Sequence, residues 1–157
     1  PKDKKYRQWA HQTVALNAYG LDVFVNVELK AATDRVKKRI CANRQAFRDV
    51  ILSLLPREAF SVQVEERSKR QASIYDYHPI AILDARYLKD PELGSHGFEY
   101  LETLVGRVPL PYFTVRRRID RNKVLELSGK DQGRSLVCEV VRIMKAFHPL
   151  VEFINRE

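Results

Sequence analysis

The stretch LDVFVNVELK, residues 21–30, shows the clearest secondary-structure pattern in the chain. Its odd positions are all aliphatic, and its even positions are polar except for Phe24. Alternation with a period of two is typical of a β-strand that buries one face. The pattern therefore predicts a core strand whose other face presents Phe24 together with Glu28 and Lys30.

Apolar residues at helical spacing predict a helix on each side of this strand. The first covers residues 3–19, and Gly20 suits the end of a helix because glycine readily adopts left-handed backbone angles. The second covers residues 33–55, with Thr33 or Asp34 as its N-cap and a proline after its last turn.

The rest of the chain alternates between strand, turn and helix patterns. We expect strands at 60–65 and within 73–83, a basic loop at 67–71 between them, and an edge strand or a break at Pro79. The elements expected after these are a loop at 90–97, a short helix at 95–106, a hairpin of strands 112–119 and 123–127, a strand at 136–144 for which a helix is the alternative, and a last apolar segment at 150–154 that docks on the core.

From residue 21 to 118 the expected order of elements is β-α-β-β-α-β. This order predicts an α+β fold in which an antiparallel sheet carries its helices mainly on one face, as in a ferredoxin-like sandwich. An N-terminal helix and a C-terminal hairpin extend this core. Because the 157 residues contain no internal repeat or linker, we expect a single α+β domain over residues 1–157.

The charge balance indicates a polyanionic partner. The chain has 28 Lys and Arg against 20 Asp and Glu, a net charge of +8, and it is 45% hydrophobic, as a globular domain requires. Nucleic acid is the favoured partner. A basic surface that binds an acidic protein, a homo-oligomer, or a charge that serves solubility alone remain alternatives.

The composition also indicates the cellular compartment in which the protein is expected. No apolar run approaches the roughly 18 residues of a membrane span, so we expect no membrane partner. Cys41 and Cys138 have neither metal-site nor disulfide spacing, which favours a reducing, intracellular compartment, the cytoplasm or the nucleus. The chain begins at Pro1, which fits a processed protein, a trimmed chain or a domain of a longer one.

A sheet face that combines aromatic and basic side chains is the first candidate site. Phe24 lies on the outer face of its strand, and Tyr112, Arg116 and Arg118 share one parity in theirs. Such faces hold single-stranded nucleic acid by stacking bases and binding phosphates. The order of elements resembles that of RNA-recognition modules, although the segment SIYDYHPIAI, residues 73–82, lacks the glycine of their third-strand consensus. The cations that we expect to bind nucleic acid are Arg116, Arg117, Arg118, Arg121, Lys123, Lys37, Lys38 and Arg39.

A metal-dependent nuclease is the alternative function. Glu28-Leu29-Lys30 at the end of a hydrophobic strand, with Asp22 upstream, resembles the catalytic motif of restriction-endonuclease-like nucleases. The resemblance implies that Asp22 and Glu28 hold Mg²⁺ or Mn²⁺ and that Lys30 assists the attacking water. On one continuous strand, however, Asp22 and Glu28 lie about 20 Å apart, since the rise is ~3.3 Å per residue. An acid from a neighbouring strand, Asp76 or Asp84, would then have to replace Asp22.

A weaker metal-site pattern involves Asp76 and His78, which alternate on one strand, with Asp84 and His96 further along. Aspartate and histidine are metal ligands, but a hydrogen-bonded structural histidine explains the same pattern. We therefore expect neither a resident metal nor a cofactor, apart from the divalent ion that the nuclease alternative requires.

Overall fold

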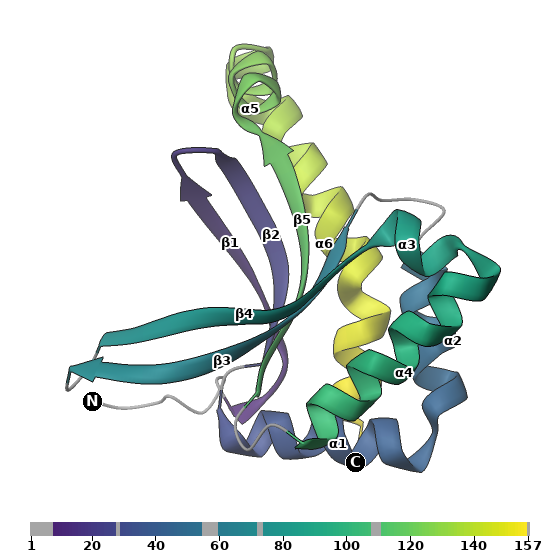
Figure 1. The fold of residues 1–157 in the computed structure, drawn as a ribbon. Coiled ribbons are helices and arrows are strands. Elements are labelled where there is room, and N and C mark those ends of the chain that lie inside the picture. The colour runs from purple at the N-terminus through teal and green to yellow at the C-terminus, as the bar shows by residue number, and fades with distance from the viewer. Residues whose placement is uncertain (1–7, 28, 55–59, 72–73, 108–110, 157) are drawn as a thin grey trace.

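The computed structural model describes residues 8–27, 29–54, 60–71, 74–107 and 111–156. A five-stranded sheet in the order β1-β2-β5-β3-β4 forms its centre, and every neighbouring pair of strands is antiparallel (Figure 1). The strands are β1 (His11–Asn17), β2 (Gly20–Val27), β3 (Ser61–Gln71), β4 (Ile74–Asp84) and β5 (Pro111–Asp120). The helices are α1 (Lys30–Ala42), α2 (Arg44–Leu54), α3 (Ala85–Lys89), α4 (Pro91–Arg107), α5 (Arg121–Ser128), the 3-10 turn η2 (Asp131–Gly133) and α6 (Arg134–Asn155).

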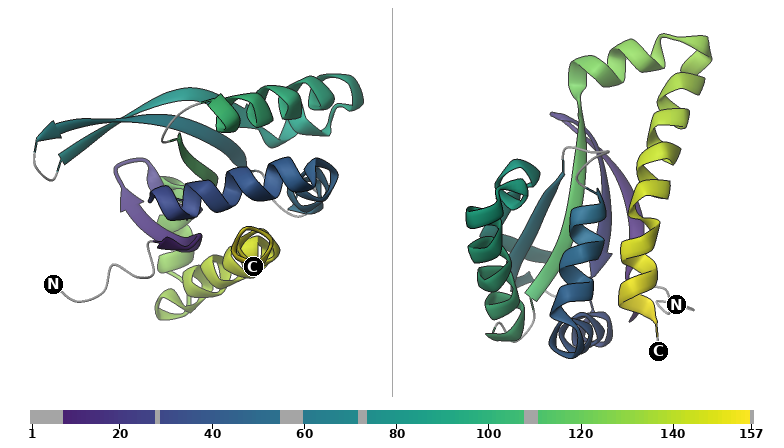
Figure 2. Two further views of the ribbon diagram at one scale, coloured as in Figure 1. Left: turned by 90° about the horizontal axis from the view of Figure 1, so that it is seen from below. Right: turned by 90° about the vertical axis from the view of Figure 1, so that its right-hand side faces the viewer.

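The helices α1, α2, α4 and α6 pack on one face of the sheet, and the hairpin of β3 and β4 extends away from them (Figures 1 and 2). The core lies between this helical layer and the sheet. It is built from aliphatic residues of β2, β3 and β5 and from apolar side chains of the helices, among them Val23, Val25, Val62, Val115, Phe47, Ile51, Phe147 and Leu150. The predicted α+β fold, with an antiparallel sheet and helices on one face, is confirmed.

The central strand is confirmed as β2. Its odd side chains, Val23, Val25 and Val27, are fully buried against the helices, as hydrophobic burial requires of an alternating strand. The strand runs from Gly20 to Val27, so it is shorter than predicted, and Lys30 already belongs to α1.

The predicted N-terminal helix is wrong where the structure describes it. Residues 11–17 form β1, which pairs antiparallel with β2 and brings Val14 opposite Val23. Gly20, with a φ of 143°, lies at the turn of this hairpin rather than at a helix end. Pairing with β1 satisfies the backbone N–H and C=O groups along the edge of β2. The stabilisation from this pairing exceeds the weak preference of the segment for a helix. Residues 3–7 of the predicted helix lie outside the described residues.

Other boundaries also differ from the prediction. The helix expected to start at Thr33 or Asp34 begins at Lys30, with Leu29 as its N-cap. The long helix is divided into α1 and α2 because the side chain of Asn43 accepts a hydrogen bond from the Ala46 amide at 2.9 Å and starts a new helix. The expected basic loop at 67–71 continues strand β3. The expected loop at 90–97 belongs mostly to α4, because the Asp90 carboxylate accepts from the first amides of that helix.

Pro79 behaves as predicted. It lies in β4, an edge strand of the sheet, next to a shift in the register with β3.

The predicted C-terminal hairpin is also wrong. Residues 121–128 form helix α5, in which Glu126 pairs with Lys123 one turn before it, and residues 134–155 form the long helix α6. The buried stripe of α6, Ile143, Phe147, Leu150 and Ile154, recurs at helical spacing. The β-branched residues at 136–144 suggested a strand, but packing on the sheet decides for helix. The expected docking of residues 150–154 on the core is confirmed.

The order β-α-β-β-α-β is confirmed between β2 and β5, counting α1 with α2 and α3 with α4 as single helical connections. In the sheet, β2 and β3 run parallel with β5 between them. The strand that splits this β-α-β unit is therefore the last one of the series, β5, and not β4 as in a ferredoxin-like sandwich. None of the described helices combines the length and the apolar character that crossing a membrane would need.

Candidate nucleic-acid interface on the open sheet face

The face of the sheet opposite the helices carries mostly polar side chains, and we call it the open face. It is defined by alternate residues of the five strands: Thr13 and Ala15 of β1, Asp22, Phe24 and Asn26 of β2, Thr114, Arg116 and Arg118 of β5, Ser61, Gln63 and Glu65 of β3, and Ile82 and Asp84 of β4. The register aligns one residue from each strand in a row across this face: Thr13, Phe24, Arg116, Ser61 and Asp84. The sheet thus brings Phe24 and Arg116 together.

The Asp22 carboxylate holds Arg118 by hydrogen bonds and lies within ion-pair distance of Arg116. Arg118 donates from Nε and Nη2 to the Asp22 carboxylate at 2.8 and 3.0 Å, and Asn17 donates to the same group at 2.8 Å. Arg116 approaches Asp22 with its Nη1 at 3.9 Å. Burial of Asp22 opposes its ionisation, but the hydrogen bonds and charges of these arginines outweigh burial and lower the pKa of its carboxyl. Asp22 therefore anchors both guanidinium groups as a carboxylate.

Aromatic rings flank the same arginines. The guanidinium carbon of Arg116 lies 5.5 Å from the centre of the Phe24 ring, and that of Arg118 lies 5.7 Å from the centre of the Tyr19 ring. Phe24 is half-buried and Tyr19 is exposed. Both distances fall within the range of cation–π contacts. The expectation that Phe24 lies on the open face is confirmed, whereas the side chain of Tyr112 lies outside the described part of the structure.

A pocket of about 480 Å³ adjoins this cluster over β3. Its lining comprises Phe60, Ser61, Gln63, Glu65, Ile82, Asp84, Arg116, Arg117, Arg118 and Asp120. Glu65 is only 7% exposed there, and burial raises the pKa of its carboxyl although the charge of Arg116 counteracts the shift. Gln63 donates from its amide to the Ser61 hydroxyl at 3.0 Å. The pocket therefore presents charged and polar groups in a partly dehydrated setting.

Sequence reasoning missed this pocket. The signal available was the alternation of Ser61, Gln63 and Glu65 with the aliphatic residues of the same strand, which indicates a polar outer face. What the pattern could not reveal is that β5 would insert beside β3 and bring Arg116 next to Ser61.

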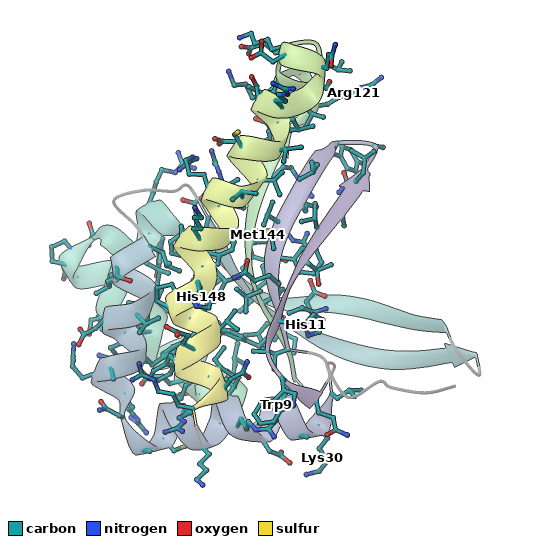
Figure 3. All side chains as sticks on the ribbon, turned by 180° about the vertical axis from the view of Figure 1, so that it is seen from behind. Trp9, His11, Lys30, Arg121, Met144 and His148 are labelled. Atoms are coloured by element: carbon teal, nitrogen blue, oxygen red, sulfur yellow. The ribbon has the colours of Figure 1, made fainter. Side chains whose placement is uncertain are left out.

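The other predicted nucleic-acid-binding cations lie elsewhere. Arg117 pairs with Val23 and so turns to the helical side, where its charge, after that of Arg142, lowers the pKa of Glu139. Arg121 and Lys123 belong to α5, at the end of the molecule opposite to Lys30 (Figure 3), and Lys123 pairs with Glu126 at 2.8 Å. The cations predicted on the helix at 33–55, Lys37, Lys38 and Arg39, are on α1 in the helical layer. The structure thus groups Arg116 and Arg118 with Phe24 on the open face and keeps Arg117 at the lining of the adjoining pocket. The cations of α1 and α5 lie apart from this group.

The predicted nuclease residues are not assembled in the described part of the chain. Asp22 is engaged by Arg118, and Lys30 forms an ion pair with Asp34 at 2.6 Å on the surface of α1. Glu28 lies outside the described residues. Within the residues that the structure describes, no group of three His, Cys, Asp or Glu side chains could hold a metal ion.

The second predicted metal pattern is also dispersed where it can be followed. The Asp84 carboxylate accepts hydrogen bonds from the backbone and side chain of Arg86, and these bonds lower the pKa of Asp84. His96 lies on α4, 4.0 Å from Glu99. The side chains of Asp76 and His78 lie outside the described part.

Comparison with known proteins found no matching family model, no matching curated protein and no matching solved structure.

Proposed function

We propose that this protein binds single-stranded nucleic acid, with RNA favoured, on the open face of its sheet. The observation that carries the proposal is the row in which Phe24 and Arg116 are neighbours, with Arg118 on the next position of the same strand face. An aromatic ring beside two arginines supplies a stacking surface and two phosphate contacts. A base stacked on an aromatic side chain contributes roughly 1–3 kcal/mol.

Single strands suit this face better than duplexes. A sheet surface that is not covered by helices can receive splayed bases, whereas the major groove of duplex DNA is commonly read by a protruding helix or ribbon. The packed helices α1, α2, α4 and α6 lie on the other side of the sheet (Figure 2). The open face therefore offers a surface on which unpaired bases can lie.

Charge on the open face sets the expected strength of binding. Two arginines, Arg116 and Arg118, share the face with the carboxyls of Asp22, Glu65 and Asp84. Binding should therefore depend on stacking and on about two phosphate contacts rather than on a broad basic surface. For single strands the slope of log K against log salt is about −0.7 per phosphate, which predicts a slope near −1.4.

Fluorescence anisotropy of labelled single-stranded RNA, single-stranded DNA and duplex DNA over a range of salt tests the proposal. Arg116→Gln should weaken binding of the single strands and flatten the salt slope by about 0.7, because one phosphate contact is lost. Lys38→Gln is the matched control: it removes one exposed positive charge from α1, on the helical side of the sheet. An unchanged slope in Arg116→Gln, or an equal loss in Lys38→Gln, would place the binding surface elsewhere.

The same experiment separates the two alternatives raised by the sequence. Running each probe with EDTA and with Mg²⁺, and checking it on a gel, detects a nuclease through cleavage that requires the metal and disappears in Glu28→Ala. Weak, non-saturating binding to every probe would instead favour an adaptor that meets an acidic protein.

A further inference from the structure

We propose that the pocket over β3 binds one guanine base of the nucleic acid and that Glu65 selects it by accepting hydrogen bonds from its Watson–Crick edge. This inference rests on the function proposed above and assigns a base to the same face. It concerns the groups that line the pocket beside Arg116, namely Gln63 and Glu65 of β3.

The first observation is the size and chemistry of the pocket. Its volume of about 480 Å³ is within the range of small-ligand sites, roughly 300–1,000 Å³. Glu65 and Gln63 are buried, with 7% and 9% exposure, and both line the pocket. Polar groups held out of water in a concave site are the usual determinants of ligand specificity.

The second observation is that the described residues donate no hydrogen bond to the Glu65 carboxyl. Among the described residues, no side chain or backbone amide donates a hydrogen bond to it, although the charge of Arg116 acts on it. A buried carboxyl without donors is unfavourable because burial removes water that would solvate it. A ligand that brings N–H groups to Glu65 would relieve this cost, so the pocket favours a donor-bearing partner.

The chemistry of the bases singles out guanine. Burial by itself favours the protonated form of Glu65, but the charge of Arg116 and two N–H donors from a bound base both favour the carboxylate. An ionised carboxylate only accepts hydrogen bonds, and it can accept two from adjacent N–H groups. The Watson–Crick edge of guanine carries two neighbouring donors, the ring N1–H and the 2-amino group. Adenine, cytosine and uracil each combine one donor with a neighbouring acceptor on that edge, and the acceptor would face the carboxylate without a hydrogen bond.

The surrounding row supports a nucleotide in this position. Arg116 lies between the pocket and Phe24, because it pairs with Ser61 of β3 on one side and with Phe24 of β2 on the other. Within the described structure its Nε has no hydrogen-bond partner. A base in the pocket would therefore leave its phosphate near Arg116 and the following base near Phe24.

The experiment compares labelled UUGUU with UUAUU, UUCUU and UUIUU, where I is inosine, by anisotropy at one low salt concentration. Inosine lacks the 2-amino group, so it removes one of the two hydrogen bonds and leaves the rest of the base unchanged. The wild-type protein should bind UUGUU about tenfold more tightly than UUAUU and UUCUU, as expected for one well-placed bidentate contact, and UUIUU should bind with an intermediate affinity. In Glu65→Gln this ratio should fall close to one, and in the exposed control Glu152→Gln it should persist.

The outcomes distinguish this inference from the proposed function. Equal binding of all four probes, with a salt slope that still depends on Arg116, would overturn the guanine site and leave the nucleic-acid interface standing. A preference for guanine that survives in Glu65→Gln would overturn the role of Glu65. Absence of binding to any probe would overturn both proposals. The comparison of guanine with inosine uses the wild-type protein, so it decides even where a thermal melt shows that Glu65→Gln is unfolded.

Discussion

Arg118 joins β5 to β2 by donating two hydrogen bonds to the carboxylate of Asp22, at 2.8 and 3.0 Å, from the position directly opposite in the register. Asp22 is 4% exposed, whereas the Arg118 side chain is 40% exposed. A bidentate pair of this kind fixes the plane of the guanidinium group. The carboxylate thus orients the arginine that we assign to phosphate binding, and it also neutralises part of its charge.

Asp22→Asn should increase the affinity for single-stranded RNA. The substitution removes a negative charge beside Arg116 and Arg118, an electrostatic gain of about 1 kcal/mol, or about fivefold in Kd. The salt slope should become steeper because the arginines are less neutralised. Anisotropy titrations at several salt concentrations measure both quantities.

The nuclease alternative predicts a different result for this variant. If Asp22 were a metal ligand, Asp22→Asn would abolish Mg²⁺-dependent cleavage, and the affinity for RNA would have no reason to increase.

Asp22→Asn also loses a charge-assisted hydrogen bond, so its free energy of unfolding should fall by roughly 1–3 kcal/mol. The binding titrations should therefore be done at a temperature at which a thermal melt shows that the variant is folded. Weaker binding by the folded variant would contradict the expectation that neutralising the arginines is the larger effect of Asp22, and would show that orienting Arg118 matters more.

Arg48 and Glu102 form a buried ion pair between α2 and α4. Arg48 donates to Glu102 at 2.8 and 3.1 Å, and the Glu102 side chain is 3% exposed. Arg48→Met would leave a buried carboxylate beside Arg44 at 3.8 Å, the other cation that the described residues place near it, and should cost about 3–5 kcal/mol of unfolding free energy. Urea denaturation measures this loss.

Two further variants test whether the charge of Arg48 is what stabilises the contact with Glu102. The double variant Arg48→Met, Glu102→Leu should recover most of the stability because no uncompensated charge remains. Arg44→Met, which removes an exposed partner, should cost less than about 1 kcal/mol. A double variant as unstable as Arg48→Met would mean that packing of the Arg48 side chain, rather than charge, stabilises the contact.

Glu65 should make stability depend on pH. Because burial raises the pKa of its carboxyl in the folded protein, the proton stabilises the folded state most at low pH, and that contribution is lost as pH rises through the raised pKa. Glu65→Gln removes the ionisation, so the variant should be more stable than wild type at neutral pH. The difference should vanish below about pH 4, under the ordinary pKa of glutamate.

Urea denaturation of both proteins at a series of pH values measures this difference. Glu152→Gln, a change of an exposed carboxyl on α6, provides the control, and its effect should stay small at every pH. A stability difference for Glu65→Gln that grows toward acid pH would show that the carboxylate, and not the protonated form, is favoured by folding.

Gly20 is required by the geometry of the first hairpin. Its φ is 143°, and a Cβ atom there would lie 2.2 Å from the carbonyl oxygen of Ile119 in β5. Gly20→Ala should therefore destabilise the protein by more than about 2 kcal/mol, since both the backbone angle and the space forbid a side chain. Gly106 of α4 is the matched control, because a Cβ there meets nothing within 4 Å. Gly106→Ala should be neutral or stabilising by up to about 1 kcal/mol.

Thermal melts measure this difference, and the melting temperature of Gly20→Ala should lie well below that of Gly106→Ala. Equal midpoints for Gly20→Ala and Gly106→Ala would show that the hairpin turn relaxes without cost.

The open-face site was only partly accessible from the sequence. Phe24 was placed correctly because its aliphatic neighbours fix which side of β2 is buried, and Arg116 and Arg118 share a parity within one strand. Arg117, Arg121 and Lys123 stand in the same basic run, yet strand alternation turns Arg117 to the helices, and a helix carries the other two away. Charge density along a chain does not distinguish these environments.

What the sequence determined by itself is local. Alternation along residues 21–27 defines a strand and its two faces, and the recurrence of apolar residues defines the buried sides of α2 and α4, because each pattern records which side of an element avoids water.

Tertiary structure decided the elements whose local signals conflict, β1 and α6, and it decided which strands are neighbours. Asp22 and Arg118 are 96 positions apart, and Arg116 reaches both Phe24 and Ser61 only because β5 inserts between β2 and β3. Backbone pairing and burial over the whole sheet select that arrangement, and no local pattern encodes it.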